Sequence, residues 1–202
     1  MKIKKLISAL VLGSMLVGLS GCNITDFSAE NLLRPPKAVG DEAEIEQLIA
    51  KTADSGYTLK YPKNGKFRSA IIMTDLDGND SNEAVAFFRN SAETSSVHML
   101  VMYSKDNSWK IASDNIFETT DIDSVDFADL TGNGKAEIIV NSTTYTPNVG
   151  KLSCYSYSEG KTNEVGSGQS CSSFVTGDFD NDGTSEIMSL VLYTTENEAL
   201  AS

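Results

Sequence analysis

Three short segments of the chain share a pattern of acidic and amide side chains that suits the binding of a metal cation. They span residues 75–83, 129–137 and 178–186, and we call them loops one, two and three. Each has the form D-[LF]-[DT]-x-[ND]-[GD]-x-x-E, in which side-chain oxygens recur at positions 1, 3, 5 and 9. Ca²⁺ takes about 6–8 oxygen ligands at roughly 2.3–2.6 Å, and a tight loop with this spacing supplies most of them. The candidate ligands are Asp75, Asp77, Asn79, Glu83, Asp129, Asn133, Glu137, Asp178, Asp180, Asp182 and Glu186.

The other positions of the loops have structural roles. The apolar residue at position 2, which is Leu76, Leu130 or Phe179, is predicted to point into the core. A glycine at position 6 allows a sharp turn that residues with a side chain resist. An EF-hand opens with similar spacing, but it needs a glutamate at position 12 and a helix on each side. Here position 12 carries no acid and the flanking segments are strand-like, so an EF-hand is rejected.

The three loops depart from the shared pattern to different degrees. Loop one has Asp80 where glycine is expected, and loop two has Thr131 where an aspartate is expected. Loop three departs least, so we expect it to be the best cation site. The alternative is that the loops are metal-free turns, in which Asp and Asn side chains accept hydrogen bonds from loop amides. The sequence leaves both alternatives open.

Strand-like segments surround the loops and repeat with them. The loops begin 54 and then 49 residues apart, and each lies between two short apolar runs. Hairpins are predicted after loops one and two, with turns at residues 105–107 and 158–161. Each repeat is therefore expected to hold four strands in about 50 residues, the size of a propeller blade. The run 97–103 is apolar on both faces, as expected for a strand between two layers.

The loop motif and its spacing resemble the FG-GAP/VCBS repeat family over residues 70–193. In that family, loops of the form D-x-D-G-D-G-x-x-[DE] join strands of integrin-α-like β-propellers and bind Ca²⁺. The resemblance implies an all-β fold, with about two and a half four-stranded blades of an incomplete β-propeller over residues 57–202. It also implies Ca²⁺ as the cofactor. Since a closed propeller needs at least about four blades, we expect a part of a longer protein; the alternative is an open array whose ends need covering.

One short helix is predicted before the strands, over residues 41–56. Asp41 is placed to cap its N-terminus with Glu44 three residues later, and Gly56 is expected to end it. One face of this helix is formed by Ile45, Leu48, Ile49 and Thr52. We expect that face to dock on the β-structure.

The first 40 residues predict export and anchoring. Lysines precede an apolar run over residues 6–19, which is shorter than the roughly 20 residues of a membrane span and is typical of a secretory signal peptide, here residues 1–21. The run ends in Leu-Ser-Gly-Cys22, which resembles the lipobox of bacterial lipoproteins. The resemblance implies lipidation of Cys22, a place on the extracytoplasmic face of the cell membrane, and an extended tether over residues 22–40. A secreted protein and an uncleaved anchor are the alternatives, and all three place the body outside the cytoplasm.

Charge and reactive residues limit the chemistry. The chain has 202 residues, and without residues 1–21, which hold three lysines and no acid, 13 basic and 28 acidic residues leave a formal net charge of −15. A surface this acidic repels nucleic acid and attracts cations. A single histidine excludes sites that need two imidazoles, and His98 is expected to be structural. Cys154 and Cys171 either form a disulfide or are separate buried strand residues, and the sequence leaves both open.

Two functions from different classes are compatible with these features. The leading hypothesis is a binding or scaffold module and not an enzyme: surface-tethered, calcium-stabilised, and recognising a protein or a glycan. The alternative is part of an extracytoplasmic enzyme whose catalytic residues lie outside this chain. Further loops of the same kind in a longer chain would favour binding, and an added catalytic motif would favour the enzyme.

We predict that Cys22→Ala releases the protein from the membrane or blocks its processing, because the thiol is the attachment point of the lipid. The wild-type chain should partition into a detergent phase and the variant should not. Phase partitioning and the size of the processed chain are the measurements. Normal cleavage with equal partitioning of the variant would contradict lipidation.

Overall fold

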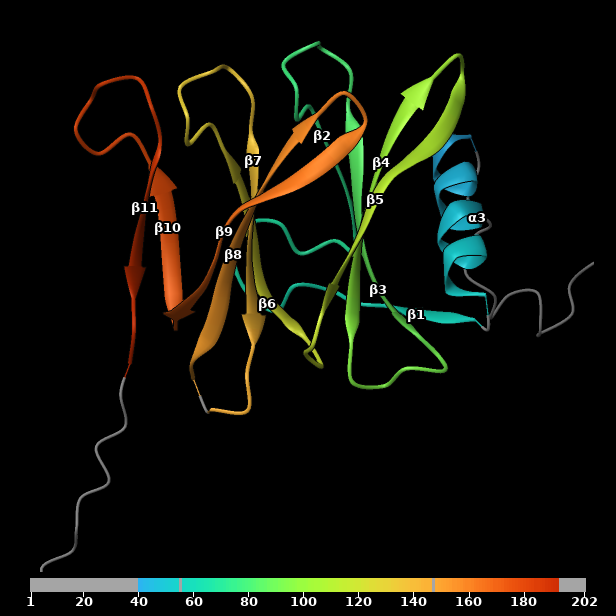
Figure 1. Cartoon of the computed structure of the whole chain (residues 1–202), viewed down its shortest axis with the longest axis horizontal. Helices are drawn as coiled ribbons and strands as arrows, with labels where there is room; N and C mark the ends of the chain where they lie inside the picture. Colours follow the sequence, from blue (N-terminus) through green and yellow to red (C-terminus); the bar gives the residue numbers. More distant parts are fainter. Residues whose placement is uncertain (1–39, 55, 147, 193–202) are drawn as a thin grey trace, which may run out of the picture. The chain divides into compact units, whose positions relative to one another are not determined.

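The described part of the chain is mostly antiparallel β-sheet with one helix, as the all-β prediction requires. The computed structural model describes residues 40–54, 56–146 and 148–192. Three sheets and the helix follow one another in chain order (Figure 1). Cys22, the predicted signal peptide and all of the predicted tether except residue 40 lie outside the described residues.

The helix α3 (Asp41–Ala53) begins differently from the prediction. Gly40 is its N-cap, with a φ of 63°, and the Gly40 carbonyl accepts the first helical hydrogen bonds. Asp41 lies inside the first turn and no side chain caps the helix, so the prediction that Asp41 is the cap is wrong. Glu44 is used elsewhere, because its carboxylate accepts a hydrogen bond at 3.2 Å from the backbone N–H of Trp109 in the first sheet. A tertiary contact has replaced the predicted local one.

The C-terminal end of α3 also differs from the prediction. The helix ends before Asp54, whose φ of 57° breaks the helical path two residues ahead of Gly56. Its buried side chains are Ile45, Ile49 and Ala53, which pack on one face of the first sheet. The predicted docking of this helix on the β-structure is confirmed.

The first sheet is a four-stranded antiparallel meander with one extra strand. Its strands are β1 (Tyr57–Leu59), β2 (Ile71–Thr74), β3 (Glu83–Asn90), β4 (Val97–Lys105) and β5 (Ser108–Phe117). Strands β2 to β5 pair in chain order, and β1 pairs with the part of β3 that β2 leaves free. Asp106 and Asn107 connect β4 to β5 with φ of 57° and 56°. Two positive φ values in a two-residue connection are typical of a type I′ hairpin, so the predicted hairpin is confirmed.

The second sheet repeats this meander. Its strands are β6 (Ile122–Ala128), β7 (Glu137–Thr143), β8 (Gly150–Ser158) and β9 (Lys161–Cys171), and they pair in chain order. Glu159 and Gly160 form the turn between β8 and β9, again with positive φ values of 51° and 74°. The third sheet has two described strands, β10 (Ser173–Gly177) and β11 (Glu186–Leu190). The four strands predicted for a repeat are therefore present in the first two repeats, and the third has two strands in the part of the chain that the structure describes.

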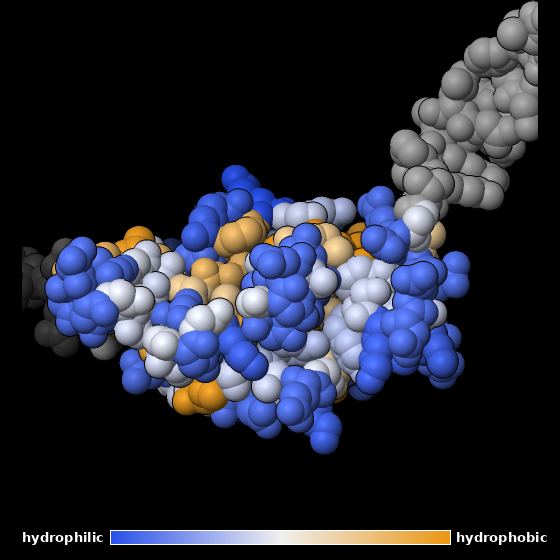
Figure 2. Space-filling view, turned by 90° about the horizontal axis from the view of Figure 1, so that it is seen from above, coloured by the Kyte–Doolittle hydropathy of each residue, from blue (hydrophilic) through white to orange (hydrophobic). Residues whose placement is uncertain are grey.

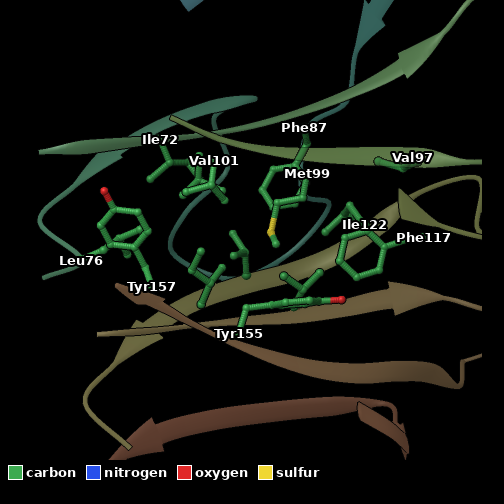
Figure 3. Packing of buried hydrophobic residues seen from close by; sticks show 14 residues of the cluster. Ile72, Leu76, Phe87, Val97, Met99, Val101, Phe117, Ile122, Tyr155 and Tyr157 are labelled. Carbon is green, nitrogen blue, oxygen red and sulfur yellow. The ribbon is translucent and has the colours of Figure 1, made fainter. Parts of the chain in front are cut away.

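Apolar side chains fill the spaces between these layers, while much of the surface seen from above is hydrophilic (Figure 2). Alternate residues of β3 and β4 divide between two clusters, one under α3 and one against the second sheet, and Figure 3 shows the cluster against the second sheet. The cluster shared by the first two sheets includes Ile72, Leu76, Val85, Phe87, Met99, Val101, Ile138, Val140, Tyr155 and Tyr157. The expectation that residues 97–103 lie between two layers is therefore confirmed. A smaller cluster joins the second sheet to the third.

The reactive residues singled out in the sequence belong to these cores. Cys154 and Cys171 are free thiols at the junction of the second and third sheets, where burial raises the pKa of both. Cys171 lies opposite Gly150 on β8, and Cys154 is four residues further along that strand, about 13 Å away at ~3.3 Å per residue. A disulfide needs Cα atoms within about 7 Å, so that alternative is wrong. His98 stacks on Phe88 with ring centroids 4.8 Å apart, and its Nδ1 lies 2.9 Å from a carboxylate oxygen of Asp114, as expected of a structural residue.

Ile49→Ala should lower the free energy of unfolding by about 2–5 kcal/mol, because Ile49 is fully buried between α3 and the first sheet. Chemical denaturation of the full chain measures the change. Gln47→Ala, at an exposed position of the same helix, is the control and should change stability by no more than about 0.5 kcal/mol. Equal losses for the two variants would show that α3 is not docked.

Candidate metal centres

The three predicted cation loops lie side by side at one end of the sheets (Figure 1). Each connects the first two strands of a meander: β2 to β3, β6 to β7, and β10 to β11. The two strands that flank each loop pair with each other, and this pairing holds the two ends of the loop close together. Equivalent residues of the three loops occupy equivalent places in the three sheets.

One hydrogen-bond scheme is common to all three loops. The carboxylate at position 1 accepts from the backbone N–H groups of positions 5 and 6, as Asp75 does from Asn79 at 3.2 Å and Asp80 at 2.9 Å. The side-chain oxygen at position 5 accepts from the N–H of position 7, at 2.7 to 2.8 Å. The glutamate at position 9 accepts from the N–H of position 2, at 2.8 Å in every copy. The sequence repeat is thus also a repeat of local structure.

Two positions of each loop adopt a positive φ. At position 6 these are Asp80, Gly134 and Gly183, with φ of 64°, 78° and 92°. Position 6 was predicted to need a glycine, and in loop one an aspartate takes the same conformation, which Asp tolerates better than most residues. Position 4 has the same requirement, met by Gly78, Gly132 and Asn181. Position 4 was missed in the sequence analysis, although glycine or asparagine at that position in every copy is a usable signal.

The loops bring different numbers of carboxylates together. In loop three, oxygens of Asp178, Asp180, Asp182 and Glu186 all lie within 4.8 Å of one another. In loop one, Asp75, Asp77 and Glu83 lie within the same distance. Loop two has the same hydrogen bonds, but Thr131 leaves it with Asp129, Asn133 and Glu137. Oxygen donors of this kind suit Ca²⁺ or Mg²⁺ and are poor ligands for soft metals.

Loop one concentrates negative charge in a partly buried place. Glu83 is 3% exposed, and burial together with the nearby charges of Asp77 and Asp75 raises the pKa of its carboxyl, against the hydrogen bond from Leu76. Burial by itself also raises the pKa of Asp75, but the loop N–H groups that donate to it outweigh this effect and leave the pKa below its ordinary value. One oxygen of Asp77, Oδ1, is buried and accepts no hydrogen bond. A cation bound here would be a ligand partner for this oxygen and would offset the repulsion between Glu83 and the neighbouring carboxylates.

The apolar residue at position 2 enters the core in two loops and not in the third. Leu76 is fully buried between the first and second sheets, and Leu130 packs at the junction of the second and third. Phe179 is 50% exposed, so its predicted burial is wrong. The reason is that the next sheet in chain order covers this position, and the described residues contain no sheet beyond the third.

Neighbouring loops contact each other directly. The N–H of Ala136 in loop two donates to the carbonyl of Leu76 in loop one at 3.0 Å, and Ser185 in loop three donates to the carbonyl of Asp129 at 2.8 Å. A Cβ added to Gly78 would lie 2.8 Å from the carbonyl oxygen of Gly134. The loops therefore form a packed row, which the separate motifs did not predict.

A polar cavity of about 480 Å³ lies at the other end of the second sheet. Its lining includes Lys63, Asn64, Asp121, Asp123, Asn141 and Thr143. Burial raises the pKa of Asp121, but ion pairs with Lys60 and Lys63 outweigh this and hold it below its ordinary value. The lining residues come from distant segments of the chain, so no sequence motif marks this cavity.

Comparisons with known proteins give no relative: no family model, curated protein or solved structure matches the chain. Among the residues that the structure describes, no helix has the length and apolar character needed to cross a membrane.

Gly78→Ala should lower the free energy of unfolding more than Gly134→Ala, by at least about 1 kcal/mol. Both residues have similar positive φ values, 74° and 78°, so both variants carry a similar backbone cost of about 1–2 kcal/mol. Only the Cβ at residue 78 meets another loop, because one at residue 134 has nothing within 4 Å. Chemical denaturation compares the two. Equal losses would mean that the loops are not in contact.

Proposed function

We propose that the protein is a surface-tethered, calcium-stabilised binding or scaffold module built from repeats of the FG-GAP/VCBS kind. The observation that carries the proposal is the common hydrogen-bond scheme of the three loops at equivalent places in three sheets. A lipid on Cys22 would hold the module at the extracytoplasmic face of the membrane, as the lipobox resemblance implies.

Calcium is the proposed cofactor because of the donors that the loops assemble. Loop three offers four carboxylates within 4.8 Å, and loop one offers three, one of which is Asp77 with its unpartnered Oδ1. A buried carboxylate oxygen without a hydrogen bond is costly, and a cation removes this cost. Ca²⁺ accepts irregular oxygen sites of this kind, whereas Mg²⁺ demands near-octahedral geometry and keeps its waters.

The sheets are proposed to be propeller-type blades in an open stack. Two four-stranded meanders and a two-stranded sheet, each with its loop between the same two strands, support this arrangement. In a closed ring, the free face of the first blade would meet the last blade. Here α3 covers that face through Ile45, Ile49 and Ala53. The helix thus takes the place of a neighbouring blade at this end.

The proposed ligand is a protein or a glycan, and the polar cavity favours a glycan. Its volume of about 480 Å³ is within the roughly 300–1,000 Å³ of typical ligand sites. Hydroxyl, amide and carboxylate groups line it, and these can hydrogen-bond sugar hydroxyls. Binding of the full chain to a glycan array tests this part of the proposal, and absence of any bound glycan would favour a protein ligand.

Asp77→Asn should abolish calcium binding at loop one without weakening the metal-free protein. The change keeps the shape of the side chain, breaks none of the loop hydrogen bonds described above, and removes one of three clustered charges. Extracellular modules bind Ca²⁺ with Kd values of about 0.1–1 mM, and a hundredfold excess over Kd stabilises a protein by about 2.7 kcal/mol. Calorimetric titration of the full chain in detergent, with melts in Ca²⁺ and in chelator, measures both effects.

Asp80→Asn is the matched control for this experiment. It removes the same charge from the same loop, but Asp80 is outside the carboxylate cluster. Calcium should still raise the melting temperature of this variant nearly as much as that of the wild type. No heat of binding and identical wild-type melts in Ca²⁺ and chelator would show that the loops are metal-free turns.

A further inference from the structure

Loop two contains an asparagine followed by a glycine, the pair of residues at which an asparagine side chain loses ammonia most readily. Glycine has no side chain to hinder its backbone nitrogen when that nitrogen attacks the preceding side chain. Asn133 and Gly134 form this pair at positions 5 and 6, and both are exposed. Loop one has Asn79 and Asp80 at the same positions, so the chain contains its own comparison.

The hydrogen bonds of loop two suit this reaction. The N–H of Gly134, whose nitrogen is the nucleophile, donates to Oδ2 of Asp129 at 2.7 Å, and this carboxylate is placed to take the proton. Oδ1 of Asn133 accepts a hydrogen bond from the N–H of Lys135 at 2.8 Å, and such a donor stabilises the negative charge that the oxygen gains during the attack. In loop one the equivalent distances are 2.9 Å and 2.7 Å. The two loops therefore differ in the side chain at position 6 and not in these hydrogen bonds.

We propose that Asn133 is a deamidation site, and that the aspartate formed there gives loop two a third carboxylate. The nitrogen of Gly134 bonds to the side-chain carbonyl carbon of Asn133, the bond from this carbon to Nδ2 breaks, and ammonia leaves with the proton. Water then opens the resulting succinimide ring. Opening at the side-chain carbonyl gives aspartate, and opening at the main-chain carbonyl gives isoaspartate, so water is the only co-reactant.

Loop three shows that this loop fold accommodates an aspartate at position 5. Asp182 is in this place, and its Oδ1 accepts a hydrogen bond from the N–H of Thr184 at 2.8 Å, the same bond that Asn133 makes in loop two. An aspartate at residue 133 would join Asp129 and Glu137, so loop two would have as many carboxylates as the cluster of loop one. The gain in cation binding rests on the calcium proposal, whereas the deamidation does not.

The isoaspartate product is expected to have the opposite effect. Its main chain passes through the former side-chain carbonyl and is one carbon longer, so the hydrogen bonds from positions 5 and 6 to Asp129 cannot both be kept. Loop two is the middle loop of the packed row and makes backbone hydrogen bonds to both neighbouring loops. Isoaspartate should therefore loosen the row and lower the melting temperature, while aspartate should not.

Peptide mass spectrometry of the full chain, after storage in warm and mildly alkaline buffer, tests the reaction. Conversion of Asn133 adds about one dalton to its peptide. Asn79, which makes the same hydrogen bonds but precedes Asp80, should convert several-fold more slowly. Gly134→Asp copies the pair of loop one, where the aspartate already has a φ of 64°, and should slow the conversion of Asn133 to the rate of Asn79. No conversion of Asn133 in the folded chain, under conditions in which the urea-unfolded chain converts, would overturn the proposal.

Asn133→Asp tests the product by calorimetric titration with Ca²⁺, in a full chain whose other loops are weakened by Asp77→Asn and Asp180→Asn. The substitution should lower the Kd of loop two by about 10-fold, because added ligand charge tightens calcium sites. Asn64→Asp adds the same charge outside the loops and should leave the Kd unchanged. An unchanged Kd for Asn133→Asp would overturn the assignment of the product to the cation site. If the wild-type chain binds no Ca²⁺ at any loop, the calcium proposal fails, and mass spectrometry still decides whether Asn133 is a modification site.

Discussion

The hydrogen bond from the N–H of position 2 to the glutamate at position 9 is the interaction on which the loop end of the molecule depends. It is 2.8 Å long in all three loops, and it ties the end of one strand to the start of the next. Glu83 and Glu137 are nearly fully buried, so their carboxylates must find donors within the protein. By fixing the backbone at position 2, this bond directs Leu76 into the sheet interface and turns its carbonyl toward the next loop. The closure of each loop and its packing against the next repeat therefore depend on the same residue, the one at position 2.

The layered arrangement follows from strands that are apolar on both faces. Val85 and Phe87 point to the second sheet while Ala84 and Phe88 point to α3, so β3 can be stable only with a cover on each side. The helix supplies one cover without being part of the repeat, which is why its glutamate binds the sheet backbone rather than capping its own N-terminus. The third sheet obeys the same pattern, with Ile187 turned inward to the second sheet and Met188 left outward.

The loops show how one scaffold can carry sites of unequal strength. Backbone N–H groups stabilise the charge at position 1 in every copy and lower the pKa of Asp75 and Asp129 despite desolvation. The difference between the loops lies at position 3, where a carboxylate is present in loops one and three and Thr131 replaces it in loop two. A loop can therefore keep its fold through hydrogen bonds while the donors that would bind a cation vary. Loop closure and cation binding are separable properties of the motif.

The sequence by itself determined the all-β class, the place of each loop between two strands, both hairpin turns and the spacing of the polar loop residues. These features depend on residues close together in the chain, such as the positive φ of Asp106 and Asn107 or the spacing of Asp75 and Glu83. Only the tertiary structure decided which faces are covered, since burial depends on segments distant in sequence. Leu76 and Phe179 hold the same position in the motif, yet one is buried and the other is half exposed, because the second sheet covers Leu76 and no sheet among the described residues covers Phe179. The same reason separated Cys154 from Cys171: their spacing allowed a disulfide, and the register of β8 against β9 placed them too far apart.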